Sequence, residues 1–140
     1  MATTLFTGLP AKEVGYGVVQ TMIKKITFAD FGTTVTVGKM PAYSHILPNS
    51  GVHVVTAFNS SGTDLLDVGF IGATTDADGY ATLLTLAAVG LIVLDELATT
   101  TNIMQAVETT VTCAPAQSVA DATAGEAYVI INFVTQYPRN

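Results

Sequence analysis

Apolar and polar residues alternate along several short segments of the chain, with the period of two that half-buried β-strands show. In the first half, the alternation covers residues 25–28 and residues 34–38. Pro41 and the turn-forming residues 48–51 interrupt it, and it resumes at residues 52–58. The pattern predicts two early strands and a third strand after the second interruption.

The middle of the chain is less regular. Residues 59–63 and 75–79 have the composition of turns, and the short apolar stretch 65–71 between them predicts a strand. The leucines of residues 80–94 fit both a short helix and two buried strands divided at Gly90. Two strands, or one strand and a helical turn, are therefore both compatible with this segment.

Two longer runs follow near the end of the chain. The first covers residues 103–113 and ends before Pro115. The second, residues 127–136, carries apolar side chains on both faces, so we expect a central strand there. Short strands separated by turn signals at intervals of about 8–12 residues are typical of sandwiches and barrels, and about eight of them can form a jelly roll. We therefore expect an all-β fold, a jelly-roll-like antiparallel β-sandwich.

The beginning of the chain does not fit this pattern. Glycines and a proline interrupt its apolar residues too often for a core strand. We expect residues 1–21 to form an extended N-terminal arm and residues 22–140 to form the sandwich domain. Apolar groups on such an arm gain stability only against a partner surface. The candidate contact residues of the arm are Leu5, Phe6, Leu9, Pro10 and Tyr16.

The composition supports a folded β-protein and makes several classes of function improbable. Among 140 residues there are 22 threonines and 12 glycines, which favour strands and turns. Hydrophobic residues make up 49% and charged residues 11%, which argues against intrinsic disorder. A net charge of −6 gives no attraction to a phosphate backbone, so we expect no nucleic-acid partner. The most apolar charge-free window, residues 79–94, is shorter than the ~20 residues of a membrane-spanning helix, and we expect no membrane partner.

Few residues have the chemistry that catalysis needs. Ser44 and His45 are adjacent, and on a strand they point to opposite faces, so they cannot form a nucleophile–base pair. His45 and His53 are expected in structural or surface roles. Cys113 is expected to be a small buried side chain, and one cysteine permits neither an intrachain disulfide nor a cysteine-based zinc cage. We predict that the chain is not an enzyme and assign no catalytic residue.

Asp76 and Asp78, followed by Gly79, resemble the start of an EF-hand calcium loop. The spacing is wrong, because the glycine stands fourth instead of sixth and Ala87 occupies the position of the closing glutamate. Phosphate-binding glycine motifs are missing as well. We therefore expect no bound metal and no cofactor.

Three stretches together resemble the small virion structural proteins of tailed bacteriophages: VHVVTAFNSSGTDLLDVG at residues 52–69, TDADGYA at residues 75–81, and TAGEAYVIINFV at residues 123–134. In that family a strand ending in TAFN, a Gly-Thr turn, a DVG strand and a late TAGEA segment before a hairpin strand recur in this order. The resemblance covers about two-thirds of the chain, from Val52 onward.

This resemblance implies a jelly-roll-like domain that decorates and cements a bacteriophage capsid, often as a symmetric oligomer. The implied partners are further copies of the chain, with a homotrimer favoured, and the major capsid protein. The implied location is the capsid surface of the virion, after assembly in the host cytoplasm. Residues 127–136 carry apolar side chains on both faces, which also favours an oligomer, because a monomer of this size should not expose so much apolar surface.

Two alternatives stay open. The chain resembles virion proteins broadly enough to be a head-fibre or tail component instead. A carbohydrate-binding β-sandwich module is the other alternative, since jelly rolls host lectins. Such modules usually present aromatic platforms, and this chain has no Trp and five Tyr.

Overall fold

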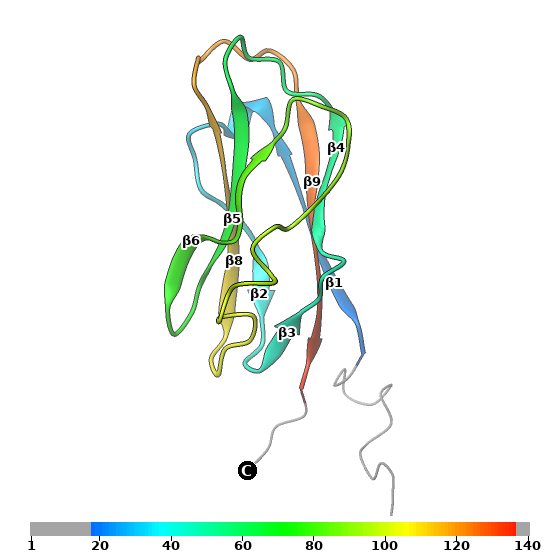
Figure 1. The fold of residues 1–140 in the computed structure, drawn as a ribbon, viewed down its shortest axis with the longest axis vertical. Helices are drawn as coiled ribbons and strands as arrows, with labels where there is room; N and C mark the ends of the chain where they lie inside the picture. Colours follow the sequence, from blue (N-terminus) through cyan, green and yellow to red (C-terminus); the bar gives the residue numbers. More distant parts are fainter. Residues whose placement is uncertain (1–17, 137–140) are drawn as a thin grey trace, which may run out of the picture.

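Nine β-strands and one short 3-10 helix form the regular structure of residues 18–136, the part of the chain that the computed structural model describes. In chain order these are β1 (Gln20–Thr27), η1 (Phe28–Asp30), β2 (Val35–Met40), β3 (Ser44–Ile46), β4 (Gly51–Thr56), β5 (Asp64–Ile71), β6 (Thr75–Thr85), β7 (Gly90–Val93), β8 (Thr109–Gln117) and β9 (Glu126–Thr135). They make two antiparallel sheets that pack face to face (Figure 1). This confirms the all-β sandwich that the alternating pattern predicts.

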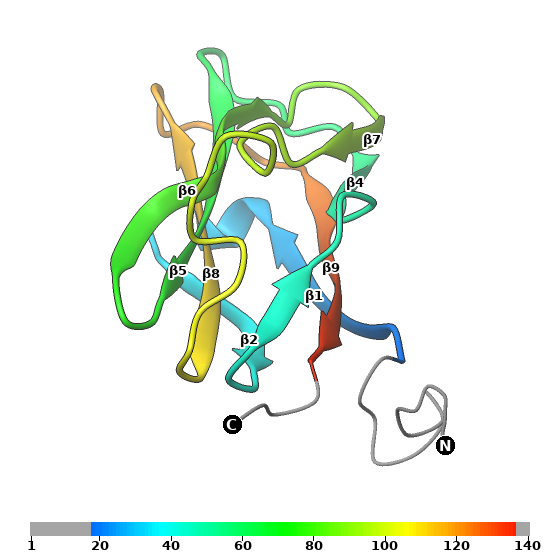
Figure 2. The same ribbon diagram turned by 60° about the horizontal axis from the view of Figure 1, so that its bottom comes forward.

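The first sheet has the order β1-β9-β4-β7, with the short β3 beside the end of β9, and the second has the order β2-β8-β5-β6. Apart from β3, the strands pair from the two ends of the chain inward: β1 with β9, β2 with β8, β4 with β7, and finally β5 with β6 as a hairpin. This nesting is compatible with the jelly-roll winding expected from the sequence. Strand β9 lies between β1 and β4, so the prediction of a central strand is confirmed. Figure 2 shows β7 at the margin of the first sheet, beside β4.

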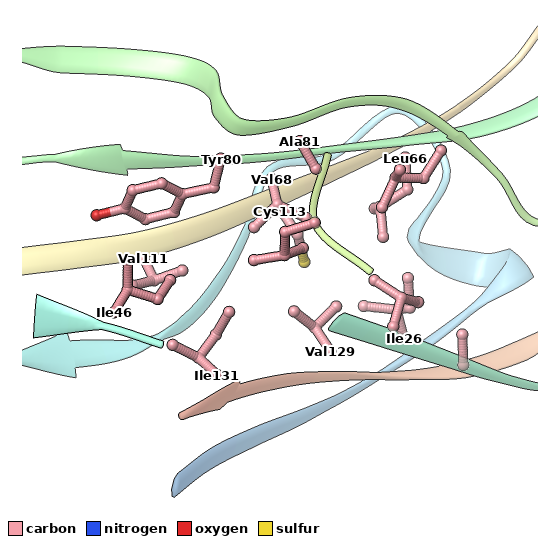
Figure 3. Packing of buried hydrophobic residues seen from close by; sticks show 14 of the residues in the cluster. Ile26, Ile46, Leu66, Val68, Tyr80, Ala81, Val111, Cys113, Val129 and Ile131 are labelled. Carbon is pink, nitrogen blue, oxygen red and sulfur yellow. The ribbon is translucent and has the colours of Figure 1, made fainter. Parts of the chain in front are cut away.

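The core lies between the two sheets and is built from the alternate residues that face inward. In β9 these include Val129 and Ile131, which are fully buried. Figure 3 shows them facing Val68 and Cys113 of the second sheet. Period-two alternation thus places one apolar series of each strand in the core and leaves the other series on the outside.

The turn predicted at residues 75–79 is wrong. The link between β5 and β6 lies at residues 72–74, and β6 already begins at Thr75. The pairing of β5 with β6 shifts register within this segment, as it does at a β-bulge. Gly79 is needed there because a Cβ atom would collide with the ring of Phe70. The glycine and the aspartates before it therefore belong to a bulged strand and not to a turn.

Two strands occupy most of residues 80–94, which agrees with one of the two alternatives for this segment. Their burial differs from the expectation. Leu84 of β6 and Leu86 just after it are buried, but Leu91 of β7 is 80% exposed. The reason is that Leu91 faces outward from the sheet on β7, an edge strand, so neither the core nor a second neighbouring strand of the described chain covers it.

The strand predicted at residues 103–113 is displaced along the chain. Strand β8 starts only at Thr109 and continues past Pro115, where the prediction had it end. Pro115 is tolerated because it lies beyond Cys113, the partner of Val35, with which β2 begins, so no ladder bond to β2 requires an N–H at Pro115. Its carbonyl accepts a hydrogen bond from the Gly32 N–H instead, at 3.0 Å.

Two early elements also differ from the prediction. Residues 25–27 of the predicted strand belong to β1, which already starts at Gln20. Phe28 lies in η1 and is 38% exposed instead of facing the core. Strand β3 is not predicted from the pattern. It is held by pairing with β9 and by a single bridge between His45 and Met104.

The arm predicted from the sequence falls almost entirely outside the described residues. Its candidate contact residues, Leu5, Phe6, Leu9, Pro10 and Tyr16, lie there. Strand β1 begins at Gln20, so the last two residues of the expected arm, 20 and 21, are part of the first sheet.

Candidate functional site

The side chains with catalytic or metal-binding chemistry are dispersed over the structure. Ser44 is buried, and its hydroxyl lies 2.9 Å from the Thr135 hydroxyl, whereas the next residue, His45, is partly exposed on the other face of β3. His53 lies on the outer face of β4, and Cys113 lies in the core. Within residues 18–136, no three His, Cys, Asp or Glu side chains gather closely enough to hold a metal ion. No helix in the same range is long and apolar enough to cross a membrane.

Cys113 has the environment of a structural residue. Burial raises the pKa of its thiol to about 12, and the negative charge of Asp30 acts in the same direction. The thiolate is the nucleophilic form, so the thiol is inert at neutral pH. This agrees with the small buried side chain expected from the sequence.

The two aspartates that resemble a calcium loop lie on the bulge of β6. The backbone N–H of Asp78 donates a hydrogen bond to Oδ1 of Asp76, at 3.3 Å. The pKa of Asp78 is raised, first by a side-chain hydrogen bond with Asp76 and further by the negative charges of Asp76 and Asp67. Calcium takes six to eight oxygen ligands, and this exposed pair provides only a small part of such a set.

The first sheet carries a row of apolar side chains across its outer face. Ile23 of β1 lies beside Ile130 of β9. On the other side of β9, Gly51 of β4 lies beside Ile130, and Val93 of β7 lies beside Gly51. Since residues in register share a face of a sheet, all of these face outward, away from the core.

A second row runs parallel to the first, and it is polar at the β1 end. It consists of Lys25, Tyr128, His53 and Leu91 in neighbouring strands. At the polar end, Glu126 contacts two residues of this row. Its Oε2 accepts a hydrogen bond from the Tyr128 hydroxyl at 3.1 Å, and its Oε1 lies 3.7 Å from Lys25 Nζ. The apolar end, at Leu91, has no such polar cover.

The outward apolar residues of these two rows, together with His53, are named the outer band: Ile23, Tyr128, Ile130, His53, Leu91 and Val93. The side chains at its two ends are the most exposed, at 80% for Leu91, 66% for Val93 and 60% for Ile23. A contiguous exposed apolar patch marks an interaction site more often than apolar side chains that are exposed singly. The outer band is therefore the candidate site for contacts with other proteins.

The outer face of the second sheet has a different character. Its middle row consists of Thr36, Thr112 and Gly69 on β2, β8 and β5. Thr112 and Gly69 are buried, so the middle of this face exposes little apolar area. The second sheet does expose Ile71 of β5 and Leu83 of β6, but singly. The exposed apolar side chains of the first sheet lie in two neighbouring rows, so the first sheet is the candidate contact surface. Sequence reasoning missed it, because the run Leu91–Val93 has the composition of a buried strand.

The fold is shared with a solved structure described as "Cyanophage Pam1 capsid asymmetric unit". The two chains superpose with a TM-score of 0.63 at 21% sequence identity, over 91% of each chain. No protein-family model matches the chain, and no curated protein matches it significantly in sequence. At this level of identity the structural similarity establishes a common β-sandwich fold.

Proposed function

We propose that the chain is a structural protein of a bacteriophage virion that decorates and stabilises the capsid through oligomeric protein–protein contacts. The observation that carries the proposal is the shared fold with a chain of a cyanophage capsid along 91% of the length. The order of the TAFN, DVG and TAGEA segments supports the same class of protein. The outer band supports a role in which apolar surface is buried against neighbours.

In this proposal the chain acts through its surface and not as an enzyme. His45 and His53 contribute to strand surfaces and Cys113 to the core. The partners are further copies of the chain, with a trimer favoured, and the major capsid protein. The proposed arm, residues 1–21, contacts a neighbouring copy or the capsid shell. A position on the outer capsid surface, away from the packaged nucleic acid, suits the net charge of −6.

The location can be tested on virions of the phage that encodes the chain. Heads and tails are separated, and an antibody against the chain is applied to each fraction before and after disruption. We expect the chain in the head fraction, accessible on intact heads. Detection in tails or fibres would replace decoration by one of the alternative virion roles. Binding of the isolated chain to a glycan array, without any association with heads, would support the carbohydrate-binding alternative.

A further inference from the structure

A sandwich with two open sheets has four edge strands, and an edge strand can pair with a further strand unless something prevents it. Here the edges are β1 and β7 of the first sheet and β2 and β6 of the second. Lys24 and Lys25 lie on β1, and Lys39 lies on β2, which also shifts register between Thr36 and Gly38. Charges and bulges on an edge strand discourage pairing.

Strand β6 is covered by the segment that follows β7. The N–H of Thr82 donates to Asp95 Oδ1 at 3.0 Å, and the N–H of Glu96 donates to the Tyr80 carbonyl at 3.1 Å. These bonds use backbone groups of β6 that a neighbouring strand would need. Within residues 18–136, β7 is therefore the one edge strand without a charge, a bulge or a covering segment.

The backbone of β7 presents hydrogen-bonding groups at this open edge. The N–H of Leu94, the residue after β7, donates to the Ser50 carbonyl at 3.4 Å, on the side of β4. Successive residues of a strand direct their backbone groups to alternate sides, so those of Leu91 and Val93 point away from β4. No strand of the described range pairs with them there. Such an edge is a template for strand addition.

The side chains of β7 define what an added strand must carry. Leu91 and Val93 are exposed on the outer face. Ile92 alternates with them and packs against the core, partly buried. A strand placed beside β7 thus meets apolar side chains on both of its faces, so it needs an apolar residue on each face and no charge.

The expected N-terminal arm contains a segment with these properties. Residues 2–11, ATTLFTGLPA, carry no charged side chain. Within them, TTLFT at residues 3–7 combines β-branched and aromatic residues with a leucine and has neither Gly nor Pro. Because neighbouring residues of a strand point to opposite faces, Leu5 and Phe6 supply one apolar side chain to each face. Five residues also match the length of β7, which has four.

The attachment of the arm favours the edge of a neighbouring copy. The arm precedes β1, which is the edge opposite β7, three strand spacings or about 14 Å away. An arm strand antiparallel to β7 runs in the direction of β1. Within one copy the chain must then turn back across the outer face to reach the start of β1. In a neighbouring copy no return is needed, and residues 8–17 form a link of at most about 33–36 Å.

We propose that residues 3–7 of one copy add as a short antiparallel strand to the β7 edge of a neighbouring copy. The backbone groups of Leu91 and Val93 hold the strand, and Leu5 and Phe6 pack beside β7, one on each face. The contact joins an arm to an edge, so it closes into a ring when successive copies are related by rotation. This inference rests on the oligomer in the proposed function and names the segment and the edge that form it.

The test of the edge uses the full-length purified chain and light scattering over a concentration series. Val93→Pro removes an N–H that points to the open edge and keeps the pairing with β4. Its matched control, Val93→Thr, keeps that N–H and nearly the same shape. We expect Val93→Pro to weaken self-association about 10-fold or more, and Val93→Thr to stay within about threefold of the parent. Circular dichroism checks the fold, and Leu91→Lys serves as the edge variant if the proline prevents folding.

The arm is tested by a charge placed inside or outside the proposed strand. Leu5→Asp puts a carboxylate into residues 3–7, whereas Ala11→Asp, the matched control, puts the same charge into the link. We expect Leu5→Asp to weaken self-association about 10-fold or more, because pairing then buries a charge. The control should stay within about twofold of the parent.

Mixing Leu5→Asp with Val93→Pro shows whether the arm reaches its own edge or that of a neighbour. The Val93→Pro copy has an intact arm, and the Leu5→Asp copy has an intact β7 edge. We therefore expect the mixture to form one-to-one pairs at concentrations at which each variant alone is monomeric. An arm bound to its own copy forms no such pairs, and that result would overturn the proposal.

Three further results would contradict it. Pairing of β7 with a second β7 predicts no effect of Leu5→Asp, and a contact of the arm with another surface predicts no effect of Val93→Pro. A parent chain that is monomeric at every concentration has no such contact at all. Because no capsid is present, these outcomes are independent of whether the chain decorates a capsid.

Discussion

Asp64 and Gln117 are partners across β5 and β8, and each keeps a buried side-chain oxygen, Oδ1 and Oε1, without a hydrogen-bond partner in the described part of the chain. Oδ2 of Asp64 accepts a hydrogen bond from the backbone N–H of Ser60, at 3.1 Å, but the Ser60 hydroxyl is unpaired as well. Buried polar atoms without partners cost free energy of folding. This end of the core is therefore less stable than its apolar centre.

Replacing Asp64 tests this polar cluster. Asp64→Asn keeps an acceptor for the Ser60 N–H and supplies an N–H₂ donor within reach of the cross-strand partner Gln117. We expect its free energy of unfolding to equal that of the parent or to exceed it by about 1 kcal/mol. Asp64→Ala leaves the Ser60 N–H without an acceptor and should lower the free energy of unfolding by ~1–3 kcal/mol. Urea unfolding at neutral pH measures both, and an Asn variant less stable than the Ala variant would contradict this interpretation.

Gly125 and Gly90 provide a matched pair of glycines. Their φ angles are 148° and 145°, a region that L side chains rarely adopt. A Cβ atom at Gly90 meets open space, whereas at Gly125 it collides with the ring of Phe58. Both Gly→Ala variants should lose ~1–3 kcal/mol through backbone strain. The collision should cost Gly125→Ala a further ~1–3 kcal/mol. Equal losses in thermal unfolding would show that Phe58 moves aside without cost.

The buried thiol of Cys113 predicts sensitivity to alkali. Its pKa is raised from an ordinary value of 9.0 to about 12 by burial, so the native state keeps a proton that the unfolded chain releases. The stabilisation is complete below the unfolded pKa and is lost as the pH rises from about 9 to about 12. We expect the free energy of unfolding to fall across this range, and the thiol to react with a disulfide reagent only after unfolding.

Cys113→Ala is the control for the alkaline effect. Burial raises the pKa of Tyr80 too, so some loss of stability at high pH should remain in the variant. The decline should nevertheless be shallower than in the parent chain. An identical decline, or a native thiol that reacts as fast as a free one, would contradict the structural role of Cys113.

The fold could be predicted from the sequence where both faces of a strand are constrained. The position of β9 between β1 and β4 was predicted correctly. Its inward series, with Val129 and Ile131, lies in the core, and its outward series includes Ile130 of the outer band. Residues 75–79 were mistaken for a turn. Local composition cannot show that Gly79 lies against the ring of Phe70, where a Cβ atom would collide. Pro115 was taken as a strand end, although it lies beyond the start of β2 at Val35, where no ladder bond to β2 requires a backbone N–H. In each case a contact distant in sequence overrides a local preference.

The candidate site could not be predicted in the same way. The outer band draws its residues from four strands, and only the register of the first sheet brings them together. The residues Leu91 and Val93 have the composition of a core strand. They are exposed because they face outward from the first sheet and because β7 is an edge strand, and both facts depend on the topology and not on the segment.

Removal of residues 1–17, which leaves β1 complete, tests the proposed arm. The sandwich should remain folded by circular dichroism, while self-association or retention on capsids should weaken at least 10-fold. Ordering an arm costs ~1–2 kcal/mol per residue. Burial of Leu5, Phe6 and Leu9, at ~1.5–3 kcal/mol each, offsets only part of this cost, so backbone hydrogen bonds to the partner should contribute. A truncated chain that assembles and binds as tightly as the parent would remove the arm from the contacts.

Reconstitution on capsids that lack this protein tests capsid decoration most directly. Purified chain is titrated onto such capsids, and the bound amount is measured after sedimentation through a sucrose gradient. We predict saturable binding to a fixed number of copies per capsid, and saturated capsids that withstand heating to a higher temperature than undecorated ones. A chain that stays at the top of the gradient at every concentration, although it is folded and oligomeric, would contradict its role as a capsid decoration protein.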